Sequence, residues 1–575
     1  MTTFAEPRSL HASRAVKEPP AARRRSRHQR QRLSEATVVF LICAALYAVV
    51  GAVLVFGFHS VMEDALSRVS NATYVLYSRQ PKLANVGFVW TPLPSLLFLP
   101  LLPLKALLPG LVATGYLASL ESAIAMALSV RTLSAILSDL RVRRAARLSV
   151  VALFAAQPLL VWFGSNGMSE ALLILFLLLA TRRLMQWLRA EDSRHLVAAG
   201  LWLALGYLSR YEVVAAGAAA VALVVAVSWL RSPHRGRRRR QEVVTDGLLI
   251  GLPVVVTFAG WALASLVIVG HPFEQFSSQY GNSALVTGER AAGGATAAFA
   301  HPHLTLLLSQ VWVLAPLLVP VAVVVAVRAV RRRQLDVLAP VALLGAVLAF
   351  EVLAYLSGSL FGFLRYQIAV LPLFTVLVGV LLATPDARTS EQGGARPHSR
   401  WLPLAAVALL LPGGILSIHT FLTNSTLANQ EYYHLRPIAL SLAGEPHVDP
   451  GANGVWNPDR TIAASLDRMR LPAGSVLLDS GPGFAVLAAT HRPRQFVITS
   501  DRDFAGAVID PVGHHIRYLL VNDGRDVYDA IRHTWPDLGS GRRTPWARLA
   551  VRYPRPLPGS HLWSLWQVAE PPPRS

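Results

Sequence analysis

The sequence has little cysteine and little charge. Cys43 is the only cysteine among 575 residues, so the chain can form neither an intrachain disulfide nor a cysteine-based metal site. Charged residues make up only 15% of the chain, whereas hydrophobic residues make up 53%. A soluble protein of this length would need more charge on its surface. Long apolar runs such as 213–230 and 304–327 instead predict helices that cross a lipid bilayer.

Acidic residues are also scarce, and the basic residues that outnumber them are clustered. The chain has 33 Asp and Glu against 54 Lys and Arg, which gives a formal net charge of +21. No groove-reading or base-stacking element accompanies the basic clusters, so the sequence predicts no nucleic acid partner. The positive-inside rule explains the clusters as the cytoplasmic ends of spans. They lie at 23–32, 141–147, 231–240 and 328–334.

The apolar runs predict about eleven transmembrane helices. Counting them from the cytoplasmic side places every arginine cluster inside. The segment 90–109 is also apolar but contains five prolines, so it is predicted to be a broken or re-entrant segment on the outer face. The candidate spans are at about 36–58, 111–137, 148–163, 168–187, 196–209, 211–230, 247–269, 304–327, 337–357, 366–384 and 401–422.

The ends of the chain differ from this central region. Residues 1–35 are basic and lack apolar periodicity, which predicts a disordered cytoplasmic tail. Residues 36–423 form the predicted multispanning domain. Residues 424–575 alternate short strand-like runs with helical candidates, which predicts a small extracytoplasmic α/β domain. The strand-like runs are 475–479, 495–499, 517–521 and 565–569. The predicted fold is therefore a polytopic all-α membrane protein with a small C-terminal α/β domain.

Ionisable residues of both signs gather at the predicted outer ends of the spans, where they are costly and point to function. They are Glu63, Asp64, Lys82, Glu170, Arg210, Glu212 and Arg365, and Tyr366 follows the last of them. Structural explanations remain open for each group. Asp64 and Arg68 could form a helix-surface pair, and Arg210 and Glu212 could neutralise each other. Arg365 and Tyr366 could lie at the membrane interface as a snorkelling and aromatic-belt pair.

Three features in this order resemble the GT-C glycosyltransferases. They are an acidic pair in the first outer loop, the sequence Trp90-Thr91-Pro92-Leu93 and a late Arg-Tyr pair at the outer start of a span. The protein mannosyltransferase and aminoarabinose transferase branch, with its soluble C-terminal domain, is the most similar. The resemblance implies a GT-C-like membrane fold and a polyprenyl-phosphate sugar donor. It also implies transfer to a glycan, lipid or protein acceptor on the outer face of the cell membrane.

The same resemblance implies a role for each candidate residue. Asp64 is expected to be the catalytic base and Glu63 its neighbour or an acceptor-orienting group, although which of the two acts stays open. Arg365 and Tyr366 are expected to contact the donor phosphate, with Lys82 and Arg210 as further cations. A carboxylate can deprotonate the acceptor hydroxyl, and the arginine fork can hold phosphate oxygens. No cofactor is implied, and a need for a divalent metal is undecided.

Two other classes of protein are compatible with the composition. A secondary transporter is also polytopic with charges inside the membrane, but it is expected to show repeated halves, which are not visible here. A non-catalytic scaffold of cell-envelope assembly would explain the outer domain but gives no reason for the clustered charges. The long segment 271–303 is expected to be either a mobile lid or a disordered loop.

Overall fold

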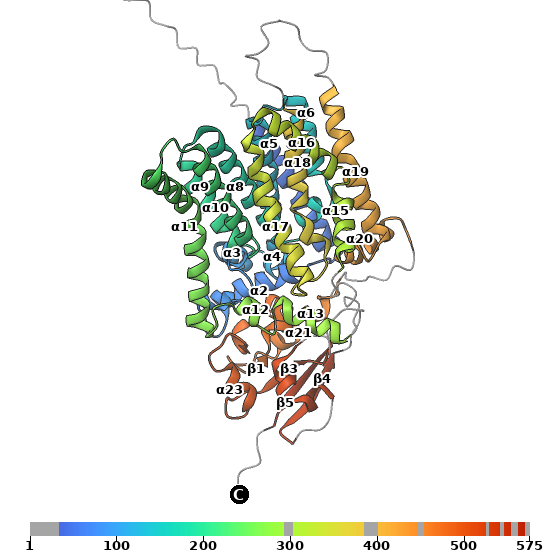
Figure 1. Cartoon of the computed structure of the whole chain (residues 1–575). Coiled ribbons are helices and arrows are strands. Elements are labelled where there is room, and N and C mark those ends of the chain that lie inside the picture. The colour runs from blue at the N-terminus through green and yellow to red at the C-terminus, as the bar shows by residue number, and fades with distance from the viewer. Residues whose placement is uncertain are drawn as a thin grey trace, which may run out of the picture.

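The computed structural model describes residues 34–292, 303–383, 401–445, 454–524, 528–540, 545–553 and 562–569. Helices form a bundle in the upper part of Figure 1, and a small sheet with its own helices lies below it. This arrangement confirms the predicted class of polytopic helical protein with a C-terminal α/β region. The predicted tail 1–35 lies outside the described residues except for its last two.

Eight helices in the described residues are long and apolar enough to cross a membrane. Each corresponds to a predicted span. They are α1 (Glu35–Ala52) continued by the π-helical turn η1 (Val53–Gly57), α5 (Tyr116–Asp139), α8 (Glu170–Ala190), α10 (Val213–Arg231), α11 (Gly236–Val269), η4 (Leu335–Val337) with α17 (Leu338–Leu356), η5 (Leu364–Gln367) with α18 (Val370–Leu382), and α19 (Leu402–Thr423).

The other three predicted spans differ from single straight helices. The run 304–327 forms α15 (Leu304–Leu314) and α16 (Leu318–Arg332), which are bent by 75° where Pro316 interrupts the helix. The run 148–163 is divided into α6 (Arg144–Ala155) and α7 (Pro158–Phe163), and the second of these begins at a proline. The run 196–209 forms α9 (Arg194–Tyr207), which has 14 residues and is shorter than a bilayer-spanning helix.

The proline-rich segment folds into short helical pieces, as its composition predicts. These are α3 (Leu93–Phe98), the 3₁₀ segment η3 (Leu99–Ala106) and α4 (Pro109–Ala113). Pro103 lies inside η3, where the missing amide prevents a regular α-helix.

Helix α2 (Glu63–Tyr77) connects the bundle to the C-terminal region, and Figure 1 shows it between the two. Most of its side chains are buried, although the helix as a whole is not strongly apolar. The Ser70 hydroxyl donates a 2.6 Å hydrogen bond to the carbonyl of Phe484. Just before the helix, the Trp456 indole donates to the carbonyl of Val61 at 3.1 Å. These contacts fix the start of α2 against the C-terminal region.

The C-terminal sheet has five strands in the order β2-β1-β3-β5-β4. Strands β1 (Val476–Leu478), β2 (Phe496–Ile498) and β3 (Tyr518–Asn522) are parallel, whereas β5 (Trp563–Val568) is antiparallel to both β3 and β4 (Ala547–Tyr553). Alternate side chains enter opposite faces. Val476 and Leu478 pack in one apolar cluster and Leu477 in another. The four strand-like runs correspond to β1, β2, β3 and β5, while β4 was not predicted.

The remaining described elements are short. They are η2 (Leu83–Val86), α12 (Glu274–Ser277), α13 (Asn282–Ala292), α20 (Asn429–Leu442), α21 (Asn457–Arg468), α22 (Ser480–Ala489), η8 (Pro493–Gln495), α23 (Phe504–Ile509), α24 (Ala530–Thr534) and α25 (Pro536–Ser540).

The described part of the segment 271–303 is helical and makes contacts on two sides. The Tyr280 hydroxyl donates to the Asp479 carboxylate at 2.8 Å, in the loop that follows β1. The Asn282 side chain donates to the Tyr211 hydroxyl at 3.1 Å, beside the loop between α9 and α10. Residues 293–302 lie outside the described part of the chain. The segment thus links the sheet region to the loop that carries Arg210 and Glu212.

Candidate active site

Asp64 and Arg365 meet although 301 residues separate them in the sequence. Asp64 lies in the first turn of α2, where the free amides of the helix end favour a carboxylate. Arg365 lies in η5, the 3₁₀ turn that leads into α18. Its Nη1 atom is 3.3 Å from Oδ2 of Asp64, and the two side chains are only 9% and 21% exposed. The fold therefore brings the predicted base and the predicted phosphate ligand into direct contact.

A second carboxylate extends this pair into a charge cluster. Glu170 begins α8 and is fully buried. Its Oε1 atom lies 2.7 Å from Nη1 of Arg210 and 3.8 Å from Nε of Arg365. Arg210 also forms an ion pair with Glu212, as one of the sequence-based alternatives predicts. We refer to Asp64, Glu170, Arg210, Glu212 and Arg365 as the charge cluster.

Tyr366 joins the two arginines of the charge cluster. The guanidinium carbon of Arg365 lies 5.2 Å from the centre of the Tyr366 ring, and that of Arg210 lies 5.9 Å from it. Both distances are within the range of cation–π attraction. Arg365 and Tyr366 are each only 7% exposed. The alternative of a snorkelling interfacial pair is therefore wrong, because both side chains are inside the protein.

Glu63 lies next to Asp64 but faces outward. Its side chain is exposed, yet the surrounding protein reduces its hydration, and the adjacent Asp64 carboxylate acts in the same direction. Together they raise the pKa of Glu63 to about 7, while Arg365 opposes the shift. A carboxyl group with this pKa can exchange a proton near neutral pH.

Lys82 is not brought into the charge cluster. It is half-buried and directly precedes η2. In the described ranges no ion pair or hydrogen bond joins Lys82 to any residue of the cluster. Among the six residues proposed from the sequence, Asp64 contacts Arg365, and Arg210 is linked to Arg365 through Glu170 and the Tyr366 ring, while Glu63 adjoins Asp64 in the sequence.

Arg68 is a further candidate, which the sequence suggested only as a surface partner of Asp64. It lies one turn after Asp64 in α2 and is only 5% exposed, so the alternative of a helix-surface pair is wrong. Its Nε and Nη1 atoms are buried without a hydrogen-bond partner, and its guanidinium lies 5.9 Å from the Trp90 ring centre. Burial lowers the pKa of Arg68, whereas Asp64 and Glu170 raise it. Unused buried donors of this kind suit an anionic ligand.

Two buried glutamates also surround the cluster. Glu351, in the middle of α17, is 3% exposed and interacts electrostatically with Arg210 and Arg365. Its position inside the apolar run 337–357 was a signal that the sequence carried. Glu431, in α20, is fully buried, and neither of its carboxyl oxygens has a hydrogen-bond partner. Burial raises the pKa of Glu431 to about 7, although Arg365 lowers it. No sequence pattern distinguished Glu431.

The side chains near the cluster show no ready-made metal site. Within the described residues, no three His, Cys, Asp or Glu side chains lie close enough together to hold a metal ion. A need for a divalent metal therefore stays undecided, as it was from the sequence.

Part of the chain matches a known protein family. Residues 113–261 match the family model of dolichyl-phosphate-mannose-protein mannosyltransferase. The resemblance to the protein mannosyltransferase branch is thereby confirmed over this segment. The segment contains Glu170, Arg210 and Glu212 of the charge cluster, whereas Asp64 and Arg365 lie outside it. A comparison with curated proteins gave no match.

Solved structures of an Archaeoglobus fulgidus oligosaccharyltransferase were also found. One, tethered to an acceptor peptide with the NVT sequon, is 12% identical with a TM-score of 0.40 and covers 85% of this chain and 69% of that chain. Another, named AglB and bound to an inhibitory peptide and a dolichol-phosphate, is 13% identical with a TM-score of 0.39 and the same coverage.

Proposed function

We propose that this protein is a membrane glycosyltransferase that uses a polyprenyl-phosphate-linked sugar donor. The acceptor is a hydroxyl of a glycan, lipid or protein on the outer face of the cell membrane. The observation that carries the proposal is the contact between Asp64 and Arg365, joined through Glu170 to Arg210. One carboxylate in contact with an arginine is the minimum needed for a base and a phosphate ligand in one site. The family match over residues 113–261 supports the same reaction class.

When the donor binds, its phosphate would replace Asp64 as the partner of Arg365. The Nε atom of Arg365 is buried without a hydrogen bond, and the 3.3 Å contact with Asp64 uses one nitrogen of the fork. A phosphate can accept two parallel hydrogen bonds from a guanidinium, so it competes well with the one hydrogen bond that Arg365 donates to Asp64 and with the longer 3.8 Å ion pair to Glu170. Arg68 supplies further unused donors nearby. Phosphate binding would thus release the Asp64 carboxylate from its ion pair.

The released carboxylate can then act on the acceptor. Asp64 takes the proton of the acceptor hydroxyl while the acceptor oxygen forms a bond to the anomeric carbon. The bond from that carbon to the donor phosphate breaks, and the phosphate leaves with the electron pair, held by the arginines. The proton on Asp64 passes to solvent or phosphate afterwards. The leaving group needs no second carboxylic acid, because a phosphate is already a good leaving group.

The position of the cluster suits a lipid-borne donor. Asp64 lies at the start of α2, between the helix bundle and the sheet, and Arg365 and Glu170 begin spans. A donor whose lipid tail stays between the helices would present its phosphate at this level. The C-terminal region lies on the same side, where it can bind an acceptor.

The reaction class is tested with purified protein reconstituted in lipid and supplied with a panel of polyprenyl-phosphate sugars and acceptors. We expect release of free polyprenyl phosphate from at least one donor, together with a glycosylated acceptor. A secondary transporter would carry a solute across the membrane, driven by an ion gradient, without releasing polyprenyl phosphate. A scaffold would neither transport a solute nor release polyprenyl phosphate. Gradient-driven uptake with no release from any donor would replace the transferase proposal with the transporter alternative.

A pH profile separates the roles of Glu63 and Asp64. Because the pKa of Glu63 is about 7, it gains its negative charge as the pH rises through neutrality. If the ionised form orients the acceptor hydroxyl, kcat/KM of the wild type should rise between pH 6 and 8. The variant Glu63→Gln should show lower activity with no inflection near 7. An inflection that persists in Glu63→Gln would assign the titration to another group, such as Glu431.

A further inference from the structure

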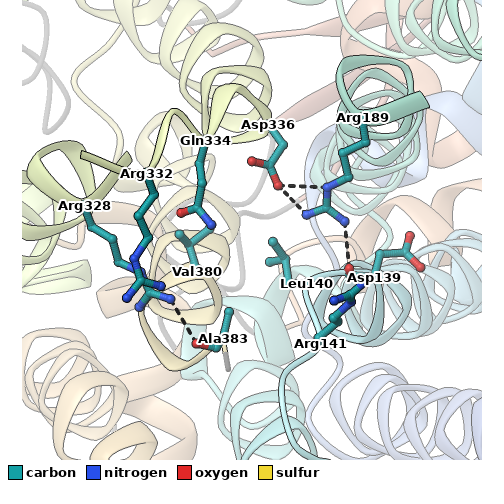
Figure 2. A pocket seen from close by; sticks show the side chains of 10 residues that line it. All are labelled: Asp139, Leu140, Arg141, Arg189, Arg328, Arg332, Gln334, Asp336, Val380 and Ala383. Carbon is teal, nitrogen blue, oxygen red and sulfur yellow. Dashed lines mark hydrogen bonds and ion pairs between the residues drawn. The ribbon is translucent and has the colours of Figure 1, made fainter. Parts of the chain in front are cut away.

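A cavity lies at the end of the helix bundle that is remote from the sheet. Its volume is about 440 Å³, and four arginines and two aspartates lie on its wall. The last turns of α5, α8, α16 and α18 meet there. Figure 2 shows two arginines projecting from one side and two from the other, with the aspartates near the second pair. These residues are Arg141, Arg189, Arg328, Arg332, Asp139 and Asp336. The cavity is within the size range of small-molecule sites.

Both carboxylates of the cavity already have arginine partners. Asp336 accepts a 3.0 Å hydrogen bond from Nε of Arg189. Asp139 pairs at 2.8 Å with Arg182, which does not line the cavity. No ion pair with a carboxylate is found for Arg328 or Arg332 in the described part of the chain. The wall therefore has more positive than negative charge.

Helix capping explains some of these arginines but not all of them. Arg328 donates to the carbonyls of Leu381 and Ala383, at 2.8 and 3.0 Å, and so stabilises the C-terminal end of α18. Its Nε atom is nevertheless buried without a partner. Arg332 lies one turn further along α16, where two like charges repel each other. Capping thus leaves Arg332 and one donor of Arg328 available to an anion.

Helix α16 also exposes an apolar strip on the side turned away from the cavity. Val323, Val327 and Val330 are 57%, 46% and 80% exposed, which is expected of side chains that contact acyl chains. None of these valines lines the cavity, so α16 borders the lipid with one side and presents Arg328 and Arg332 to the cavity with the other. Basic pockets between transmembrane helices on the cytoplasmic side bind the headgroups of anionic lipids. We propose that this cavity binds the phosphate headgroup of an anionic phospholipid.

The proposal is tested by titrating the detergent-purified full-length protein with phosphatidylglycerol or phosphatidylcholine and counting bound lipid by native mass spectrometry. The wild type should bind phosphatidylglycerol more tightly than phosphatidylcholine. Arg332→Ala should weaken phosphatidylglycerol binding about fivefold, the effect of one basic residue near an anionic headgroup. Arg331→Ala is the matched control, because Arg331 is in the same turn of α16, is exposed and does not line the cavity. It should change binding less than twofold.

Three results would overturn the proposal. Equal weakening by Arg331→Ala and Arg332→Ala would show a diffuse surface charge and no cavity site. Equal affinity for the two lipids would show that the headgroup charge is not recognised. Saturable binding of inorganic phosphate below about 1 mM, lost in Arg332→Ala, would make the ligand a free phosphate and not a lipid. Arg332 is exposed, so its substitution should leave the unfolding temperature unchanged.

Discussion

Replacing Asp64 by asparagine should lower the rate of sugar transfer by about 10² to 10⁴, the usual contribution of a general base. The amide is nearly the same size as the carboxylate but does not accept a proton. The same substitution removes the competitor of the donor phosphate for Arg365, which Asp64 contacts at 3.3 Å. Asp64→Asn should therefore bind the donor at least as tightly as the wild type. Both quantities are measured on reconstituted protein, as product formed and as donor bound at equilibrium.

The matched control is Asp139→Asn. Asp139 also forms an ion pair with an arginine, at 2.8 Å from Arg182, but it lies at the opposite end of the bundle. Its replacement should leave transfer within about twofold of the wild type, because no substrate group reaches it. If Asp64→Asn keeps more than a tenth of the activity while Glu63→Gln is inactive, the base is Glu63. Weaker donor binding by Asp64→Asn would contradict the exchange of partners at Arg365.

Replacing Arg365 by alanine should raise the KM for the donor far more than the KM for the acceptor. A hydrogen bond to a charged group contributes about 1.5 to 3 kcal/mol, so we expect about a 10- to 150-fold increase for the donor. Arg365→Lys keeps the charge but loses the two-pronged fork, and should recover only part of donor binding. Steady-state kinetics with each substrate varied in turn measure the two effects separately.

A structural role of Arg365 would give a different pattern. Removing one partner of a buried ion pair destabilises a protein by about 3 to 5 kcal/mol, so Arg365→Ala could lose activity by unfolding. The unfolding temperature of Arg365→Ala is therefore measured beside that of Arg182→Ala, which breaks the pair with Asp139. Equal increases of the two KM values, together with a large drop in unfolding temperature, would contradict phosphate binding by Arg365.

The sequence predicted the membrane architecture well because apolar runs are long local signals. Seven of the eight long helices begin and end within about five residues of the predicted limits, whereas α11 begins at Gly236, well before the predicted start at 247. Three runs differ from this pattern. The runs 148–163 and 304–327 are each interrupted at a proline, and the run 196–209 forms a single helix of only 14 residues. Strand β4 was missed because five consecutive residues of this outermost strand are exposed, so its sequence ARLAVRY lacks an alternating buried face.

The charge cluster was predicted in part, for a physical reason. Ionisable residues next to apolar runs are visible in the sequence, and four of the six candidates do meet in one place. Their contacts join elements that are distant in the chain, which local patterns do not specify. The sequence did not show that Lys82 has no bond to the cluster. It also did not show that Arg68 is buried with free donors, or that Glu431 in α20 is buried near Arg365.

The release of free polyprenyl phosphate by four reconstituted proteins tests most directly whether Asp64 and Arg365 act as one catalytic unit. The four proteins are the wild type, Asp64→Asn, Arg365→Ala and the double variant. Residues that act together give strongly non-additive losses. We predict release by the wild type, a large loss in each single variant, and a double variant no worse than the slower single one. Losses that multiply in the double variant would contradict a shared site, and release unaffected by either substitution would place the chemistry elsewhere.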